Sequence, residues 1–206
     1  MAKVAVVDYG MGNLRSVSQA VLHVAAGSGV DVVVTQSPQD VLAADRVVLP
    51  GQGAMRDCMR ALGESGLQDA VLHAATHKPL LGVCVGMQML FDGSDESPDH
   101  PGLGVLPGRV TLLPEGVKRP QMQWNVLDWA PGTAMASGQP DPTWAYFVHS
   151  YWAEVADPAD VAATCHYGTA VTAAIQHERL WATQFHPEKS AHNGLRLLEA
   201  FVESLG

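Results

Sequence analysis

Cys84 has the sequence surroundings of an enzyme nucleophile. It is flanked by glycines in Gly82-Val83-Cys84-Val85-Gly86, after the apolar run of residues 80–83 and before a helix-like stretch over residues 87–91. A strand, a glycine-flanked turn and a helix in this order expose a nucleophile at the edge of a parallel sheet. The N–H groups at the start of such a helix favour a thiolate over a thiol. Cys84 is therefore the candidate nucleophile.

A structural role in the core is the alternative for every cysteine, because free cysteines are commonly small buried residues. The strand before Cys84 and the helix after it favour catalysis there. Cys58 falls on an expected helix over residues 54–62, and Cys165 lies in a β-branched run without flanking glycines, so we expect both to be structural. The odd number of cysteines and the lack of C-x-x-C spacing argue against a disulfide framework or a zinc site. We expect reduced thiols, no metal and no cofactor.

The base that a thiol nucleophile needs is best supplied by His186. Such a base needs a third group to fix its tautomer and orientation. In His186-Pro187-Glu188, the proline favours an extended backbone at His186, and side chains two residues apart in extended chain project to one side. His186 and Glu188 are therefore the candidate base and orienting acid.

The other histidines give weaker signals. His23, His73 and His77 fall on expected helices without a suitably placed acid, and we assign them no role. His149 ends an aromatic, strand-like run, where a structural role and a contact with a ligand are both open, since loops at strand ends carry many binding groups.

Amide hydrolysis places negative charge on the former carbonyl oxygen, so the site needs backbone N–H donors where this charge develops. The N–H group of Val85 is the first candidate. The strand-like run 47–49 leads into Pro50-Gly51-Gln52-Gly53, a turn from which a second N–H group could reach the same sheet edge. Taken alone, a glycine-rich turn after a strand also occurs as a simple tight turn.

These residues must be positioned by elements of an α/β fold. Short β-branched runs alternate with helical stretches in the first 83 residues, which predicts a parallel sheet covered by helices on both faces. Asn13 is the expected N-cap of a helix that ends near residues 27–29, and Ser37-Pro38 is expected to start a short helix. The predicted strands cover residues 4–8, 32–35, 46–49 and 80–83.

After residue 91 the chain is rich in turn formers and short strand-like runs, which predicts an antiparallel section. A helix from about Ala191 to Leu205 is expected to close a single domain of residues 1–206. The predicted strands of this section cover residues 109–113, 144–148, 161–165, 171–176 and 181–185.

Composition excludes several classes of function. The chain has 206 residues, a net charge of −9 and no run of Lys or Arg, so we expect no nucleic-acid partner. The first apolar run reaches Asp8 too early for a signal peptide or a membrane span. We therefore expect no membrane partner and a cytoplasmic location.

Taken together, the motifs around Gly51, Cys84 and His186, and the order in which they occur, are similar to those of the triad-type glutamine amidotransferases. The resemblance extends over nearly the whole chain. It implies a flavodoxin-like amidotransferase fold, an α/β architecture with a mixed, mostly parallel sheet flanked by helices and an antiparallel C-terminal section. The motifs are Pro50-Gly51-Gln52-Gly53, Gly82-Val83-Cys84-Val85-Gly86-Met87-Gln88 and His186-Pro187-Glu188.

The resemblance also implies roles for individual residues. Cys84 would attack the side-chain amide of glutamine, His186 would transfer protons, and Glu188 would orient His186. Further implied roles are the shaping of the oxyanion loop by Gly51 and Gly53, a contact with glutamine by Gln88, and the lining of its pocket by His149, Ser150 and Tyr151.

A partner is implied as well, a (β/α)₈ cyclase subunit that would form a heterodimer with this chain and receive its ammonia directly. Ammonia released into water is protonated and ceases to be a nucleophile, which favours transfer through a dry path. We expect the isolated chain to be nearly inactive, and the cyclase with its nucleotide ligand to assemble the oxyanion donors at the Gly51-Gln52-Gly53 turn.

The sequence departs from the family pattern at three positions. Val85 stands where leucine is usual, which matters little if its N–H group is what acts. Gln121 and Gln123 stand where His and Gly are expected, which puts a specific role for both at the partner interface in doubt, whereas Met122, Trp124 and Asn125 match.

Two other functions compete with this interpretation. One is a different amidotransferase subunit or cysteine hydrolase of related fold, which assays of ammonia release with several synthase partners would separate. The other is a catalytically silent binding module, for which Cys84→Ala would change only stability.

Overall fold

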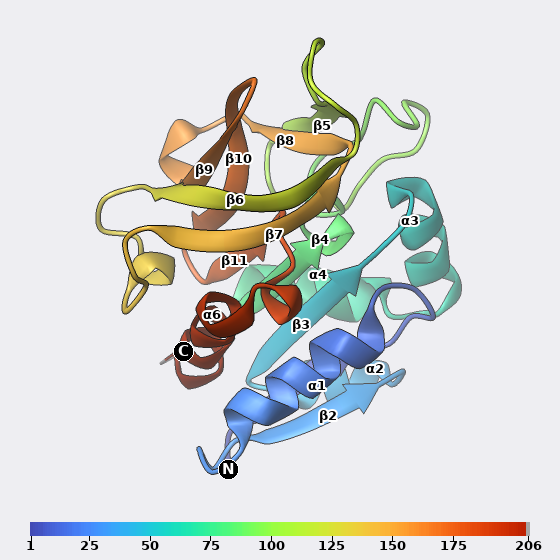
Figure 1. Ribbon diagram of the computed structural model, residues 1–206. Coiled ribbons are helices and arrows are strands. Elements are labelled where there is room, and N and C mark those ends of the chain that lie inside the picture. Colours follow the sequence, from blue (N-terminus) through green and yellow to red (C-terminus); the bar gives the residue numbers. More distant parts are fainter. Residues whose placement is uncertain (205–206) are drawn as a thin grey trace.

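The computed structural model describes residues 1–204 and has a nine-stranded mixed sheet at its centre (Figure 1). The strand order is β2-β1-β3-β4-β11-β10-β9-β6-β7, and β2, β1, β3, β4 and β11 run parallel. The α/β fold predicted from the alternation of strands and helices is confirmed. The first four strands are β1 (Lys3–Val7), β2 (Asp31–Thr35), β3 (Arg46–Gly51) and β4 (Leu80–Cys84).

The parallel strands form where the sequence has continuous apolar runs. Every residue of β3 and β4 is buried, as expected for central strands that are covered on both faces. Helices α1 and α6 pack together on one face of the sheet, and α2 and α4 pack together on the other (Figure 1). The helices are α1 (Leu14–Ala25), α2 (Pro38–Ala43), α3 (Met55–Glu64), α4 (Gln68–His77), α5 (Val85–Gln88) and α6 (Ala191–Glu203).

The predicted starts of two helices have different outcomes. Ser37 caps α2 as predicted, because its side chain accepts a hydrogen bond from Asp40 N, and Pro38 occupies the first helical turn. Asn13 is the N-cap residue of α1 as predicted, and its carbonyl oxygen accepts from Val17 N, but its side chain makes no capping hydrogen bond. The last helix ends at Glu203, and the predicted end at Leu205 lies outside the described residues.

The second half of the chain adds antiparallel strands to the sheet. Strands β10, β9, β6 and β7 continue the sheet beyond β11, and β5 pairs with β8 in a separate two-stranded sheet. Strands β6 and β8 were not predicted. The bounds are β5 (Gly108–Leu112), β6 (Gln121–Trp129), β7 (Thr143–His149), β8 (Tyr151–Val155), β9 (Val161–Tyr167), β10 (Thr169–His177) and β11 (Leu180–Thr183).

Strand β11 has a different place from the one expected. It is antiparallel to β10, but it also pairs in parallel with β4, with Thr183 opposite Val83. The expected purely antiparallel section was therefore wrong for this strand. Because neighbouring parallel strands end at the same sheet edge, the residues that follow β11 lie beside Cys84.

Among the described residues, no helix has the length and apolar character needed to cross a bilayer.

Candidate active site

Cys84 occupies a sharp turn at the carboxyl end of β4. Its backbone is in a rare conformation, with φ 55° and ψ −111°, of the kind that non-glycine residues adopt mainly at functional sites. Helix α5 follows at once, so the strand, turn and helix predicted around this residue are present, although α5 spans only Val85–Gln88. The elbow therefore presents the sulfur at the sheet edge.

Glycine is required where the elbow meets the end of β3. A Cβ atom on Gly86 would lie 2.0 Å from the carbonyl oxygen of Leu49, and one on Gly51 would lie 2.3 Å from the backbone nitrogen of Gly86. No side chain fits at these distances. The two glycines thus allow the turn after β3 to pack directly against the elbow that carries Cys84.

His186 and Glu188 form a buried pair beside this elbow. Nδ1 of His186 lies 2.8 Å from Oε1 of Glu188, and the exposed fractions of the two side chains are 3% and 0%. Asn13 donates a second hydrogen bond to the same oxygen, at 3.0 Å. The side chain of Asn13, which makes no capping hydrogen bond to α1, therefore holds the carboxylate of Glu188, and Glu188 in turn holds the imidazole of His186.

The backbone that pairs these residues differs from the predicted one. His186 is extended, but Pro187–Lys189 form a 3₁₀ turn, so the extended chain expected through Glu188 was wrong. The tight turn brings the carboxylate back to Nδ1. The pairing itself was predicted from the spacing, and the route by which it arises was not.

Burial lowers the pKa of His186, but contacts with Cys84 and Glu188 outweigh burial and raise the pKa to about 10. An imidazole held between a sulfur and a carboxylate is stabilised in its protonated form. The arrangement is therefore suited to a thiolate–imidazolium pair, in which the proton of Cys84 resides on His186.

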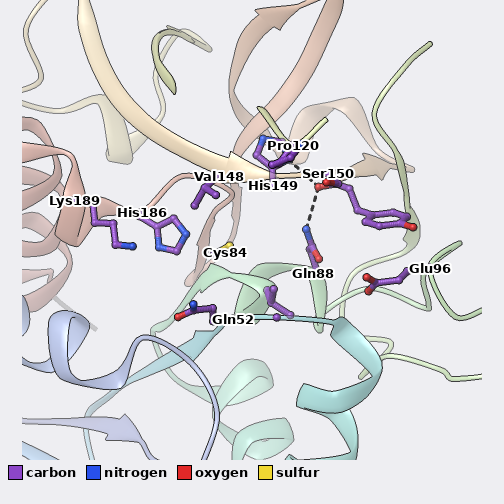
Figure 2. Close-up of a pocket in the computed structure, with 13 residues that line it drawn as sticks. Gln52, Cys84, Gln88, Glu96, Pro120, Val148, His149, Ser150, His186 and Lys189 are labelled. Atoms are coloured by element: carbon purple, nitrogen blue, oxygen red, sulfur yellow. Dashed lines mark hydrogen bonds between the residues drawn. The ribbon is translucent and has the colours of Figure 1, made fainter. Parts of the chain in front are cut away.

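A cavity of about 310 Å³ opens over Cys84 and His186 (Figure 2). All four residues that were expected to contact glutamine line this cavity. Of the expected oxyanion donors, Val85 and Gly53 also line it. Gly51 does not line the cavity but packs behind it, and Glu188 lies behind His186. The lining consists of Gln52, Gly53, Cys84, Val85, Gln88, Glu96, Pro120, Val148, His149, Ser150, Tyr151, His186 and Lys189.

Gln88 is fixed by two hydrogen bonds from its amide nitrogen. One goes to the carbonyl oxygen of Tyr151 and the other to Oε1 of Gln184, both at 3.0 Å. The amide nitrogen of Gln184 in turn lies 3.9 Å from the sulfur of Cys84. Gln184 is fully buried, so one side chain connects the nucleophile with Gln88.

His149 is neutral and held from both sides. Burial lowers its pKa to about 4, and its Nδ1 lies 2.8 Å from the carbonyl oxygen of Tyr151. Its Nε2 lies 3.0 Å from the side-chain oxygen Oε1 of Gln121. Both partners are acceptor oxygens, so the single N–H group of the neutral ring donates to one of them, and the tautomer decides which.

Gln121 is fully buried. Its burial argues against a direct contact with the partner, in line with the doubt that its departure from the family pattern raises. Its neighbours on β6 are different, because Gln123 is exposed and Asn125 is partly exposed, with its side chain bonded to the carbonyl oxygen of His166. The residue at position 121 therefore acts on the pocket through His149.

Sequence reasoning gave no role to Gln184, Asn13 or Glu96 in this site. Gln184 had a usable signal, because it stands directly before Phe185-His186 at the end of a predicted strand. Asn13 and Glu96 had none, since only the folded chain brings them to the active-site edge. Glu96 lines the cavity and accepts a hydrogen bond from the backbone nitrogen of Met55, at the start of α3.

Comparisons with known proteins agree with this geometry. The family model described as "Glutamine amidotransferase class-I" matches residues 5–205. A relative from Dechloromonas aromatica (strain RCB), "Imidazole glycerol phosphate synthase subunit HisH", is 53% identical, with 97% of this chain and 95% of the relative covered. A protein of the same description from Methylococcus capsulatus is 48% identical, with 98% of this chain and 96% of the relative covered.

Solved structures show the same fold at low sequence identity. A crystal structure titled as a glutamine amidotransferase superimposes with a TM-score of 0.73 at 20% identity, covering 96% of this chain and 98% of the other. A glutamine amidotransferase from Thermotoga maritima superimposes with a TM-score of 0.65 at 15% identity, covering 98% of this chain and 99% of the other.

Proposed function

The chain belongs to the class-I glutamine amidotransferase family, and from this premise we propose that it is the glutaminase subunit of an imidazole glycerol phosphate synthase. It hydrolyses glutamine to glutamate and ammonia. The ammonia passes to a (β/α)₈ cyclase subunit, which forms imidazole glycerol phosphate and aminoimidazole carboxamide ribotide in histidine biosynthesis. The observation that carries the chemistry is the convergence of Cys84, His186 and Glu188 at one sheet edge.

The residues of the site supply each step of the reaction. The sulfur of Cys84 attacks the side-chain amide carbon of glutamine, and His186 donates a proton to the departing nitrogen, so that ammonia leaves and a thioester remains. A water molecule then attacks the thioester, and His186 accepts its proton. Glutamate is released and Cys84 is regenerated.

Charge on the attacked oxygen is stabilised by backbone N–H groups in this proposal. Val85 supplies one, and the turn that carries Gly51 and Gly53 supplies another. The turn packs directly against the elbow, and Gly53 and Val85 both line the cavity over Cys84, which supports the assignment. Gln88, His149, Ser150 and Tyr151 contact the substrate glutamine.

An exposed apolar patch supports a partner beside the cavity. Met122, Trp124 and Trp144 project from β6 and β7 with exposed fractions of 61%, 44% and 45%. Met122 pairs in register with Val148, which lines the cavity. We propose that this patch belongs to the heterodimer interface, and that the bound cyclase activates the glutaminase. A single domain and a cytoplasmic location, both expected from the sequence, are part of the same proposal.

Transfer of labelled nitrogen tests the function. The chain is mixed with a purified cyclase subunit, its nucleotide substrate and glutamine labelled with ¹⁵N in the side-chain amide, and the label is followed into product. We expect incorporation with this partner and none with the synthase subunits of other amidotransferases. Cys84→Ala should abolish transfer from glutamine but leave the reaction with added ammonium intact. Transfer at the parent rate by Cys84→Ala would refute the proposal.

A further inference from the structure

Gln184 is a fully buried polar side chain next to the nucleophile, and the proposed chemistry does not use it. It follows β11 directly and does not line the cavity over Cys84. Its backbone is held by the sheet, because its N–H group donates to the carbonyl oxygen of Ala173 on β10 at 2.9 Å. A buried amide costs free energy unless its polar atoms have partners. Here the oxygen is bonded by Gln88, and the nitrogen lies at the sulfur of Cys84.

The surrounding hydrogen bonds fix which end of the Gln184 amide faces the sulfur. The carbonyl oxygen of Tyr151 can only accept, so the atom of Gln88 that meets it, along the dashed line in Figure 2, is the amide nitrogen. The same nitrogen meets the side chain of Gln184 at 3.0 Å, and its second hydrogen requires an oxygen there. The opposite end of this amide is therefore the NH₂ group, which lies 3.9 Å from the sulfur of Cys84.

An N–H donor at this place favours the charged form of the sulfur. A thiolate carries a full negative charge and accepts a hydrogen bond better than a thiol does. His186 also contacts the sulfur, but it gains and loses a proton during the proposed reaction. An amide does not titrate, so Gln184 remains a donor both when the thiolate attacks glutamine and when it leaves the thioester.

We propose that Gln184 is a catalytic residue of glutamine hydrolysis, whose amide N–H group holds the thiolate of Cys84 while its oxygen holds the amide of Gln88. The inference rests on the proposed function and adds one residue to its chemistry. A single buried side chain then sets both the charge state of the nucleophile and the direction of a group expected to contact glutamine. Loss of the N–H group should lower kcat, and loss of the oxygen should raise KM.

Two substitutions separate the two ends of the amide. Gln184→Glu retains an oxygen that accepts from Gln88 but replaces the donor with a carboxyl oxygen, whose charge opposes a thiolate. Gln184→Met keeps the length of the side chain and removes both ends. Gln176→Met is the matched control, because the oxygen of Gln176 on β10 also accepts two hydrogen bonds, from Thr133 and from the backbone nitrogen of Met135, but lies outside the cavity over the nucleophile.

The pH profile of Cys84 alkylation by iodoacetamide measures the donor directly, because the thiolate is the reacting form and no glutamine is needed. One hydrogen bond to a charged group corresponds to a shift of about one to two pH units. The midpoint should therefore rise by about this amount in Gln184→Met, rise further in Gln184→Glu and keep the parent value in Gln176→Met. Parent midpoints in both Gln184 variants would overturn the inference.

Steady-state kinetics of the complex with the cyclase subunit separate the two hydrogen bonds. At neutral pH, kcat should fall about tenfold or more in both Gln184 variants, the fold-change that corresponds to one lost hydrogen bond to a charged group. KM should rise in Gln184→Met, where Gln88 loses a partner, and stay within about twofold of the parent in Gln184→Glu. Parent kcat in both variants, or the same rise of KM in both, would show that the two ends of the amide do not have separate roles.

NMR of the parent chain tests the contact without any substitution at Gln184, so a variant that fails to fold does not decide the outcome. The side-chain amide protons of ¹⁵N-labelled Gln184 should shift with the midpoint of the alkylation profile, and Cys84→Ala should lack this shift. No shift in the parent would overturn the inference. A parent complex without glutamine hydrolysis, combined with raised alkylation midpoints in the Gln184 variants, would overturn the proposed function and support the contact with the sulfur.

Discussion

Replacement of Glu188 by glutamine tests how the buried acid tunes His186. The carboxylate is fully buried and lies 2.8 Å from Nδ1, and together with Cys84 it raises the pKa of His186 to about 10 against the effect of burial. Glutamine keeps the size of the side chain and an oxygen that accepts from Nδ1. The substitution therefore removes the negative charge and leaves the geometry in place.

The size of the effect follows from the lost charge. A hydrogen bond to a charged group contributes about 1.5–3 kcal/mol, which corresponds to a fall of about one to two units in the pKa of His186. The pKa of His186 is higher in the folded state than its ordinary value of 6.5, so the protonated ring stabilises the fold fully below pH 6.5. This stabilisation is lost as the pH rises through about 10. The variant should therefore be least stable relative to the parent below pH 6.5, and the difference should disappear above pH 10.

The assay is an NMR titration of ¹³C-labelled histidine in parent and variant, with the free energy of unfolding measured over the same pH range. Glutamine hydrolysis by the cyclase complex should fall by about two to four orders of magnitude, as expected when the orienting acid of a triad is lost. Asp160→Asn is the matched control, because Asp160 holds the exposed His177 at the same 2.8 Å but lies outside the cavity. An unchanged pKa of His186 in Glu188→Gln, or hydrolysis at the parent rate, would show that the carboxylate does not tune the imidazole.

Three further substitutions test other parts of the site. Gly86→Ala should lower the melting temperature by several degrees, because the added carbon would lie 2.0 Å from the carbonyl oxygen of Leu49 and such overpacking costs about 1–3 kcal/mol. An unchanged melting temperature in a thermal scan would contradict the close packing. Gln121→Leu should raise KM for glutamine and destabilise the fold by about 1–3 kcal/mol, because Nε2 of His149 loses its hydrogen-bond partner Oε1. Denaturant unfolding and kinetics measure both effects, and parent values would show that the amide is dispensable. Trp124→Asp should weaken the heterodimer in calorimetric titration without changing the melting temperature of the free chain, and parent affinity would exclude Trp124 from the interface.

The parallel half of the fold could be predicted because its signals are local. Continuous apolar runs marked β1, β2, β3 and β4, and the glycines around Cys84 marked the elbow. Strand β6 was missed because its exposure does not alternate simply, and large apolar side chains such as Met122 and Trp124 face solvent. An alternation test assumes that apolar residues face the core, which fails on a surface that we propose to be an interface.

The candidate site could be predicted as a set of residues but not as a network. Spacing alone identified Cys84 and the His186–Glu188 pair, which the fold places around one cavity edge. The parallel pairing of β11 with β4, which brings the two segments together, depends on contacts distant in sequence. The same is true of Asn13, whose role as a partner of Glu188 no local pattern announces.

Detection of the acyl-enzyme is the decisive test of the mechanism. The complex with the cyclase subunit is mixed with glutamine, quenched in acid within a turnover and digested, and the peptides are examined by mass spectrometry. A γ-glutamyl thioester should appear on Cys84, be removed by hydroxylamine, and be absent from Cys58 and Cys165. A thioester on another residue, or glutamine hydrolysis at the parent rate by Cys84→Ala, would contradict the assignment of Cys84 as the nucleophile.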